Sequence, residues 1–311
     1  MPSFLVVGES LVDIVVPADG SSRHNAVGGS CLNVAVGLAR LDVPTTLVTR
    51  VGDDDFGRQV AEHVQASDVV LSPGSVVTDG TTSTATAHLD TEHAATYEFD
   101  LEWDLPTVDL PTDVLGVHVG SLGATLEPGK AAVMDLVRRA VDADVFVSYD
   151  PNIRPFFLRD REAAWRDVCE IAGGARLVKL SDEDLELLRP GSPHDDVCRE
   201  LLAGRHTEVV VLTRGGRGAT AYTEGATLHV PAPPTDVVDT VGAGDSFMAA
   251  MLAMLCDWDV PAGGEGALRA LDDARVELLV RGAAAAAAVT CSRRGANPPT
   301  RRELSPTWPA G

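Results

Sequence analysis

The chain has 311 residues, of which 45% are hydrophobic and 23% are charged, and its formal net charge is −21. This acidity argues against nucleic acid and anionic membranes as partners, because both are bound by a surplus of Lys and Arg. The five cysteines are far apart and form no CxxC pair, so we expect neither a disulfide framework nor a zinc site. The composition predicts a globular protein of a reducing compartment, and we expect it in the cytoplasm.

Apolar, β-branched runs alternate with helical patterns along most of the chain. The expected strands are residues 1–16, 45–52, 114–121, 144–150, 175–181 and 208–214. The expected helices are residues 31–41, 53–64, 130–141 and 161–172. This alternation predicts an α/β fold with a mostly parallel central sheet and helices on both of its faces.

Residues 81–103 depart from this alternation. They are rich in β-branched and aromatic residues around a polar turn, with no helix between, which predicts a β-hairpin. We expect the hairpin and residues 14–25 to form a small lid on a single domain spanning residues 1–311. Because exposed lid strands often need covering, a homodimer through the lid is a further expectation.

Residues 239–247 read DTVGAGDSF and are followed by an apolar helical run. The spacing fits neither the dinucleotide fingerprint nor Walker A. Glycines at a helix start instead favour an anion cradle, formed by the backbone of Gly242, Ala243 and Gly244. Asp245 is then suited to be the base that takes a proton from a hydroxyl during phosphoryl transfer. The alternative is that Asp245 is only an acid in the first turn of a helix.

This stretch is similar to the C-terminal motif of the PfkB (ribokinase-like) carbohydrate kinase family. Residues 27–41, VGGSCLNVAVGLARL, resemble the N-terminal motif of that family. Further blocks resemble the family in order, at residues 51–57, 150–155, 178–188 and 210–219. The resemblance covers essentially the whole chain and is greatest to fructokinases. It implies a ribokinase-like fold and ATP-dependent phosphorylation of a sugar hydroxyl.

The resemblance also implies roles for individual residues. Asp245 would be the catalytic base, beside an anion hole formed by Gly242, Ala243 and Gly244. The sugar would be bound by Asp13, Gly28, Gly29, Asn33 and Arg154. The nucleotide would lie along Thr213, Gly215 and Gly218. Buried sugar hydroxyls need fixed donors and acceptors, which independently favours Asp13 and Asn33. A helix cap at Asn33, a surface ion pair at Arg154 and an ordinary turn at residues 213–218 are the alternatives.

Two cation sites follow from the same resemblance. Many family members carry an NxxE motif linked to magnesium, and Ser181 and Asp184 stand at its Asn and Glu positions here. We expect Asp184 to act on Mg²⁺ through a water molecule, since Mg²⁺ commonly keeps several waters. Related kinases bind K⁺ beside the anion hole, which here implies Asp239 and Val241 together with the turn at residues 292–297.

The function that we expect is therefore that of an ATP- and Mg²⁺-dependent fructokinase. Ribokinase and 2-keto-3-deoxygluconate kinase are alternatives on the same scaffold. A sugar- or nucleotide-binding regulator without activity is the alternative from a different class, and the intact Asp245 argues against it. A nucleoside kinase is less favoured, because the first residues of the chain hold no aromatic pair on which a base could stack.

Overall fold

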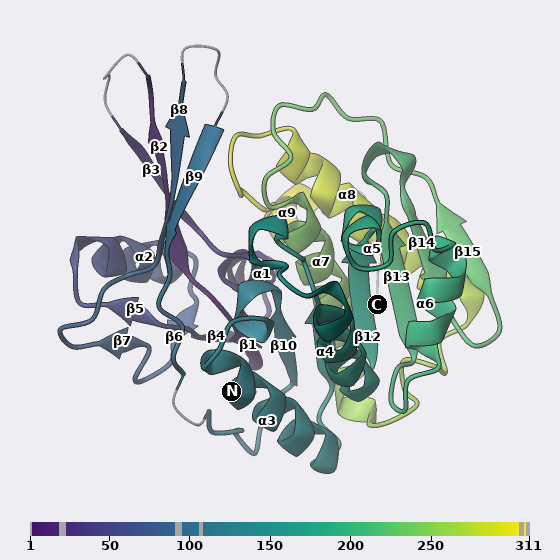
Figure 1. Cartoon of the computed structure of the whole chain (residues 1–311). Coiled ribbons are helices and arrows are strands. Elements are labelled where there is room, and N and C mark those ends of the chain that lie inside the picture. The colour runs from purple at the N-terminus through teal and green to yellow at the C-terminus, as the bar shows by residue number, and fades with distance from the viewer. Residues whose placement is uncertain (1, 19–22, 91–94, 106–107, 305–307, 309–311) are drawn as a thin grey trace.

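The computed structural model describes residues 2–18, 23–90, 95–105, 108–304 and 308. Its centre is a nine-stranded sheet with the strand order β15-β14-β13-β12-β11-β10-β1-β4-β6 (Figure 1). The strands are β1 (Phe4–Val7), β4 (Thr45–Val48), β6 (Val70–Leu71), β10 (Gly116–Gly120), β11 (Val147–Asp150), β12 (Leu177–Ser181), β13 (Val209–Thr213), β14 (Ala219–Tyr222) and β15 (Thr227–Val230). All neighbouring pairs are parallel except β13–β14 and β14–β15. This confirms the expected, mostly parallel sheet.

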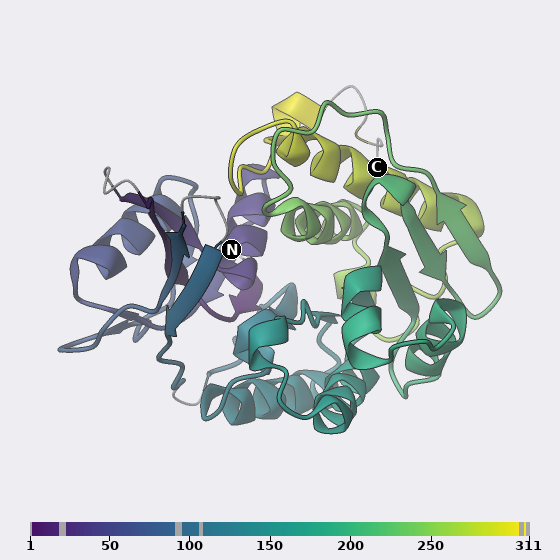
Figure 2. The ribbon, with the colours of Figure 1, turned by 45° about the horizontal axis from the view of Figure 1, so that its top comes forward.

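Helices cover both faces of this sheet (Figure 2). One face packs against α1 (Ser30–Arg40), α7 (Ala243–Asp257) and α8 (Asp273–Cys291), and the other against α3 (Gly129–Asp142), α4 (Arg161–Gly174), α5 (Asp182–Leu188) and α6 (His194–Leu202). Each face of the sheet has its own hydrophobic core, and the side chains of β1 alternate between the two. Phe4 and Val6 lie in the core beside α1, α7 and α8, whereas Leu5 and Val7 lie in the core on the other face. The remaining helices are α2 (Asp55–Gln65) and α9 (Arg301–Leu304). In the described part of the chain, no helix is both long and apolar enough to cross a membrane.

The order of the strands determines where a ligand can bind. From β1 the chain proceeds to β4 and β6 on one side, whereas β10 to β13 follow on the other side. The direction of winding therefore changes between β1 and β10. In open α/β sheets, ligands bind outside the carboxyl ends of the strands at such a switch point.

A second sheet of four strands stands beside the central sheet, at the left of Figure 1. It contains β3 (His24–Gly28), β2 (Leu11–Val16), β8 (Thr84–Leu89) and β9 (Ala95–Asp100), in this order. The pairs β2–β3 and β8–β9 are antiparallel, and β8–β9 is the hairpin expected in residues 81–103. Of the two segments assigned to the lid, residues 19–22 and 91–94 lie outside the described residues.

The four-stranded sheet is anchored at one end and contacts the main body through aromatic rings. The guanidinium of Arg50 forms ion pairs with Glu102 and Asp104, just beyond β9, and donates to Thr81 O at 2.8 Å. The ring of Phe99 on β9 lies 4.6 Å from that of Phe156, which follows β11. The small sheet is thus held beside the carboxyl ends of the central strands.

Two expected strands are each divided between two sheets. Residues 1–16 form β1 in the central sheet and β2 in the small sheet, because the chain turns at Gly8 and Glu9. A Cβ at Gly8 would lie 2.2 Å from Sγ of Cys31, so only glycine allows this close packing. Residues 45–52 likewise divide into β4 and β5 (Val51–Gly52), and β5 pairs with β7 (Val76–Val77). An apolar run predicts an extended chain but does not specify the partner strand.

Candidate active site

Helix α7 begins near the carboxyl ends of the central strands, at a short glycine-containing turn. Its N-cap, Gly242, has φ 75°, and a Cβ there would lie 2.7 Å from Cβ of Ala296, so both backbone and space require glycine. The first intrahelical hydrogen bond runs from Ser246 N to Gly242 O at 2.9 Å. The N–H groups of Gly244 and Asp245 precede this bond and have no acceptor within the helix. With the helix dipole, they can bind an anion here.

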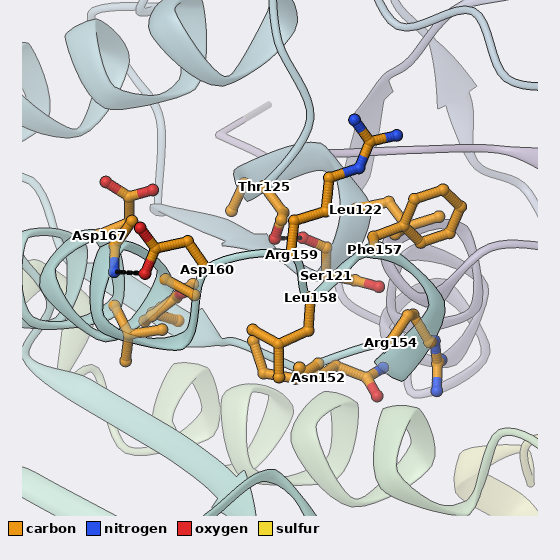
Figure 3. A pocket seen from close by; sticks show the side chains of 16 residues that line it. Ser121, Leu122, Thr125, Asn152, Arg154, Phe157, Leu158, Arg159, Asp160 and Asp167 are labelled. Carbon is orange, nitrogen blue, oxygen red and sulfur yellow. Dashed lines mark hydrogen bonds between the residues drawn. The ribbon is translucent and has the colours of Figure 1, made fainter. Parts of the chain in front are cut away.

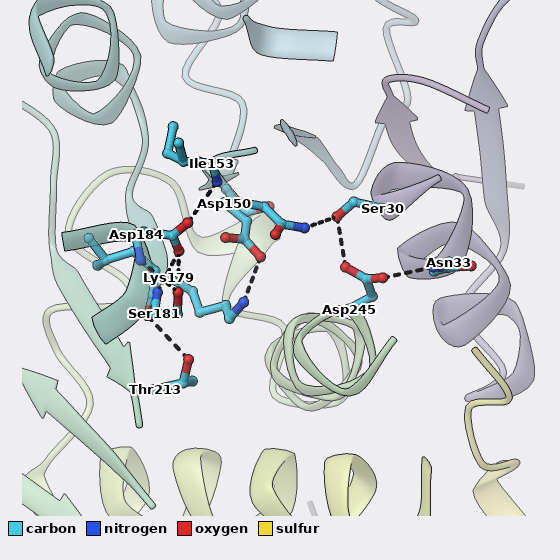
Figure 4. Close-up of polar contacts among 12 residues, drawn as sticks. Ser30, Asn33, Asp150, Ile153, Lys179, Ser181, Asp184, Thr213 and Asp245 are labelled. Atoms are coloured by element: carbon cyan, nitrogen blue, oxygen red, sulfur yellow. Dashed lines mark hydrogen bonds and ion pairs between the residues drawn. The ribbon is translucent and has the colours of Figure 1, made fainter. Parts of the chain in front are cut away.

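The carboxylate of Asp245 is 6% exposed and lies at the centre of a hydrogen-bond network (Figure 4). Ser30 Oγ donates to its Oδ1 at 2.7 Å, and Asn33 Nδ2 donates to its Oδ2 at 2.8 Å. Asn152 Nδ2 donates in turn to Ser30 Oγ at 2.9 Å. Each carboxylate oxygen keeps a further lone pair, so a hydroxyl group can still donate to it. Asn33 therefore orients Asp245, and Ser30 and Asn152 are site residues that the sequence analysis missed.

The buried Glu9 positions the start of α1, and with it Ser30. Its carboxylate accepts from Ser30 N at 3.0 Å and from Gly123 N at 2.9 Å. Burial raises the pKa of Glu9, and these backbone hydrogen bonds oppose that effect. Gly29 has φ 119°, and a Cβ on it would lie 2.4 Å from Glu9 O. Gly29 is thus required for the close approach of the two segments.

Asp13 lies on β2 of the small sheet, where it is exposed to solvent. A Cβ at Gly28, on the neighbouring strand, would lie 2.5 Å from Asp13 Oδ2, so the carboxylate takes the space that a side chain would fill. Although the residue is exposed, partial desolvation raises the pKa of Asp13, and the charge of Arg154 lowers it. Of the expected sugar-binding residues, Gly28 therefore leaves space for the carboxylate of Asp13, and the charge of Arg154 acts on that same carboxylate.

A cavity of about 180 Å³ separates the short helix η1 (Ser121–Ala124) from the segment that follows β11 (Figure 3). Ser121, Asn152 and Arg154 are among the residues that line it. The side chain of Arg154 is exposed and forms no hydrogen bond or ion pair with any other described residue, although its carbonyl accepts from Phe157 N at 3.0 Å. No hydrogen bond or ion pair therefore holds its guanidinium in one position, and it can reorient toward a ligand.

Lys179 and Asp150 form a buried ion pair that the sequence analysis did not identify (Figure 4). Lys179 Nζ lies 2.7 Å from Asp150 Oδ2, and the two residues are 4% and 1% exposed. Burial raises the pKa of Asp150 to about 6, although the charge of Lys179 opposes this rise. The sequence did contain a signal for this pair, since a lysine lies within one apolar strand and an aspartate ends another. Buried charges need partners, so the two could have been expected to pair.

A larger cavity, of about 500 Å³, adjoins the start of α7. Its walls include the expected nucleotide-binding residues Thr213, Gly215 and Gly218, together with Ala243 and Gly244 of the expected anion hole. Most of the remaining lining is apolar and comes from Phe247, Ala284, Ala287, Ala288, Pro233, Pro234 and Val237. An apolar cavity that ends at an anion-binding helix start is suited to a base at one end and phosphates at the other.

The oxygens of Asp184 are turned toward the protein backbone. Its Oδ1 accepts from Ile153 N at 2.6 Å, and its Oδ2 accepts from Ser181 N at 2.7 Å and Ser181 Oγ at 2.6 Å. These bonds cap α5 and hold the segment after β11. By contrast, the buried Oδ1 of Asp150 has no partner among the described residues. The described part of the chain has no group of three or more His, Cys, Asp or Glu side chains placed to hold a metal.

The two segments expected to flank a monovalent cation lie next to one another. Asp239 Oδ2 accepts from Gly295 N at 2.8 Å, and Asp239 Oδ1 accepts from Val241 N at 3.1 Å. These hydrogen bonds, the one from Gly295 first, lower the pKa of Asp239. The loop of residues 239–241 is thereby joined to the turn of residues 292–297, directly before the start of α7.

Known proteins resemble the chain in sequence and in structure. Residues 1–302 match the pfkB family carbohydrate kinase. A fructokinase from Rhizobium leguminosarum bv. trifolii is 33% identical over 262 residues, covering 81% of this chain and 79% of that protein. The structure of fructokinase with bound ATP from Xylella fastidiosa has a TM-score of 0.83 and 26% identity, covering 98% and 97% of the two chains.

A riboside kinase has the same fold. The aminoimidazole riboside kinase from Salmonella enterica, complexed with aminoimidazole riboside and an ATP analogue, has a TM-score of 0.77 and 25% identity, covering 99% of this chain and 100% of the other. The fold is therefore ribokinase-like, as the motifs implied. The match across residues 1–302, together with the fructokinase relatives, confirms that the chain is a sugar kinase. It belongs to the pfkB family of carbohydrate kinases.

Proposed function

We propose that this sugar kinase is an ATP-dependent fructokinase with Asp245 as its catalytic base. The observation that carries the proposal is the position of the buried Asp245 carboxylate. It lies at the anion-binding start of α7, beside the large cavity that Gly244 lines. The fructokinase names of the relatives support fructose as the sugar.

The chemistry is an in-line displacement at phosphorus. Asp245 accepts the proton of the attacking sugar hydroxyl as the new O–P bond forms and the bond to the leaving nucleotide breaks. Ser30 and Asn33 hold the carboxylate so that a free lone pair points to that hydroxyl. The N–H groups of Gly244 and Asp245 stabilise the charge on the phosphoryl oxygens, whereas the N–H of Ala243 already donates to Thr240 O at 3.2 Å. Asp13 and Arg154 bind the other hydroxyl groups of the sugar.

Two cations belong to the proposal. A bound Mg²⁺ would neutralise phosphate charge. The free Oδ1 of Asp150 fits a water molecule of a hydrated ion better than the oxygens of Asp184, both of which already accept hydrogen bonds from the protein. K⁺ would lie at the loop containing Asp239 and Val241, where it would order the start of α7. This part rests on the contact of that loop with Gly295.

The four-stranded sheet would act as the lid. It carries Asp13 and stands beside the carboxyl ends of the central strands (Figure 1). Closure over the sugar would exclude water, which otherwise competes with the sugar hydroxyl for the phosphoryl group. The contact of Phe99 with Phe156 is suited to hold the two parts together.

An ADP-release assay over a panel of sugars tests the substrate. We expect the highest kcat/KM for fructose among ketoses, aldoses, sugar acids, sugar phosphates and nucleosides. Chelation of Mg²⁺ should abolish turnover, and replacing potassium by choline at equal ionic strength should lower it. Preference for ribose would identify a ribokinase, and preference for a keto-sugar acid a 2-keto-3-deoxygluconate kinase. Sugar and nucleotide binding without turnover would instead identify a regulator.

We further propose that the lid pairs two copies in a homodimer. The strands β3 and β9 lie at the edges of the small sheet, and each has one side that pairs with no other described strand. Tyr97 on β9 is 57% exposed. Light scattering at micromolar concentration should give twice the chain mass of 32.6 kDa. Tyr97→Asp should shift this mass toward the monomer, while Tyr97→Phe should not. A monomeric wild-type protein would contradict the proposal.

The cytoplasm is the compartment that we propose for this kinase. Its five cysteines are all free thiols, which fits a reducing compartment. ATP, the phosphoryl donor of the proposed reaction, is a metabolite of the same compartment.

A further inference from the structure

Lysine is rare in this chain. Of its 25 Lys and Arg residues, only Lys130 and Lys179 are lysines. Lys179 is the lysine near Asp245. It extends from β12 and is 4% exposed. A Cβ at Gly244 would lie 3.0 Å from Lys179 Nζ, so the ammonium group faces the start of α7. It therefore stands where the phosphate-binding N–H groups converge, at a glycine that also lines the nucleotide cavity.

Carboxylates keep the ammonium group of Lys179 charged although it is buried. Burial lowers the pKa of Lys179, but the charges of Asp150, Asp184 and Asp245 outweigh this effect and raise it. Within the described part of the chain, Asp150 is the one hydrogen-bond acceptor that Lys179 reaches, so one of its three N–H donors is used. His118 is neutral and adds no charge, because burial, followed by the charge of Lys179, lowers its pKa to about 3. Two donors remain for a ligand.

We propose that Lys179 is a further catalytic residue, which binds the oxygens of the transferred phosphoryl group together with the N–H groups at the start of α7. The inference rests on the proposed kinase function. Lys179 stays protonated throughout: the hydroxyl proton passes to Asp245, and the electron pair of the broken P–O bond leaves with ADP. Asp150 holds the ammonium group in place through one hydrogen bond.

The competing explanation is that Lys179 only neutralises the buried Asp150. A double-mutant cycle separates the two, because it compares Lys179→Met in the wild type and in Asp150→Asn. If Lys179 contacts the phosphoryl group, the substitution should still lower kcat by about 10²-fold when Asp150 is already neutral. If it only pairs with Asp150, kcat of the double variant should equal that of Asp150→Asn, which would overturn the proposal. Unfolding temperatures show whether each variant folds.

Binding measurements test the same inference without turnover. Lys179→Met should weaken binding of the β,γ-imido analogue of ATP by about tenfold or more, and should change ADP affinity less, because ADP lacks the transferred group. Lys130→Met, at a lysine paired with Asp167 on the outer helices, is the matched control and should leave both affinities unchanged. Equal weakening of ADP and the analogue would contradict the role.

The scarcity of lysine permits a direct spectroscopic test. Protein with isotope-labelled lysine should give two side-chain signals, which Lys130→Arg assigns. The Lys179 signal should shift when the β,γ-imido analogue is added and less when ADP is added, while the Lys130 signal stays constant. These readouts need no particular sugar, so failure of fructose in the panel refutes the fructokinase proposal alone. An unmoved Lys179 signal refutes this inference alone.

Discussion

Replacement of Asp245 by asparagine is expected to lower kcat by about 10²–10⁴-fold, because the side chain keeps its size but can no longer accept the hydroxyl proton. The new amide can still accept from Asn33 and donate to Ser30, so we expect the fold to persist. Nucleotide affinity should stay the same or rise, since a negative charge near the terminal phosphate is removed. Steady-state kinetics and calorimetric binding of the β,γ-imido analogue measure the two effects.

Asp273→Asn is the matched control for this substitution. Asp273 is also an acid in the first turn of a helix, α8, but it is exposed and lies outside the site. Its replacement should leave kcat unchanged. If Asp245→Asn behaved like this control, Asp245 would be only a helix-start acid, and the proposed mechanism would be wrong.

Asp13→Ala should lower kcat/KM for the sugar by about 10²-fold, mainly through a higher KM. Hydrogen bonds from a charged group contribute about 1.5–3 kcal/mol each, and Asp13 would make them in both the ground state and the transition state. ATP affinity should not change, because Asp13 lies on the small sheet and not in the cavity of the nucleotide. Kinetics at varied sugar and at varied ATP separate the two effects.

The control for this substitution lies on the same sheet. Glu98 on β9 is exposed and pairs with His88 on β8, so Glu98→Ala removes a lid carboxylate without touching the neighbourhood of Asp13. The control should keep the sugar KM of the wild type. An unchanged KM for Asp13→Ala, or a loss confined to kcat, would rule out Asp13 as a ligand of the sugar hydroxyls.

Local sequence patterns predicted individual strands of this fold but not how those strands pair. The apolar β-branched runs at residues 144–150 and 208–214 were predicted as strands, and the structure contains β11 and β13 there. The extended conformation of such runs follows from residues close together in the chain, because their alternating or continuous apolar pattern favours a β-strand. The division of residues 1–16 between two sheets was missed, since strand pairing depends on contacts distant in sequence.

The sequence by itself determined the start of α7: glycines, an aspartate and an apolar run specify a tight turn, a helix start and a carboxylate within a few residues. The tertiary structure alone decided what surrounds that carboxylate. Ser30 and Asn33 reach Asp245 across more than 200 residues of chain, and Lys179 approaches Gly244 from the centre of the sheet. Motifs can contain such residues, but their contacts arise only when strands and helices pack, because packing sets the distances between side chains far apart in sequence.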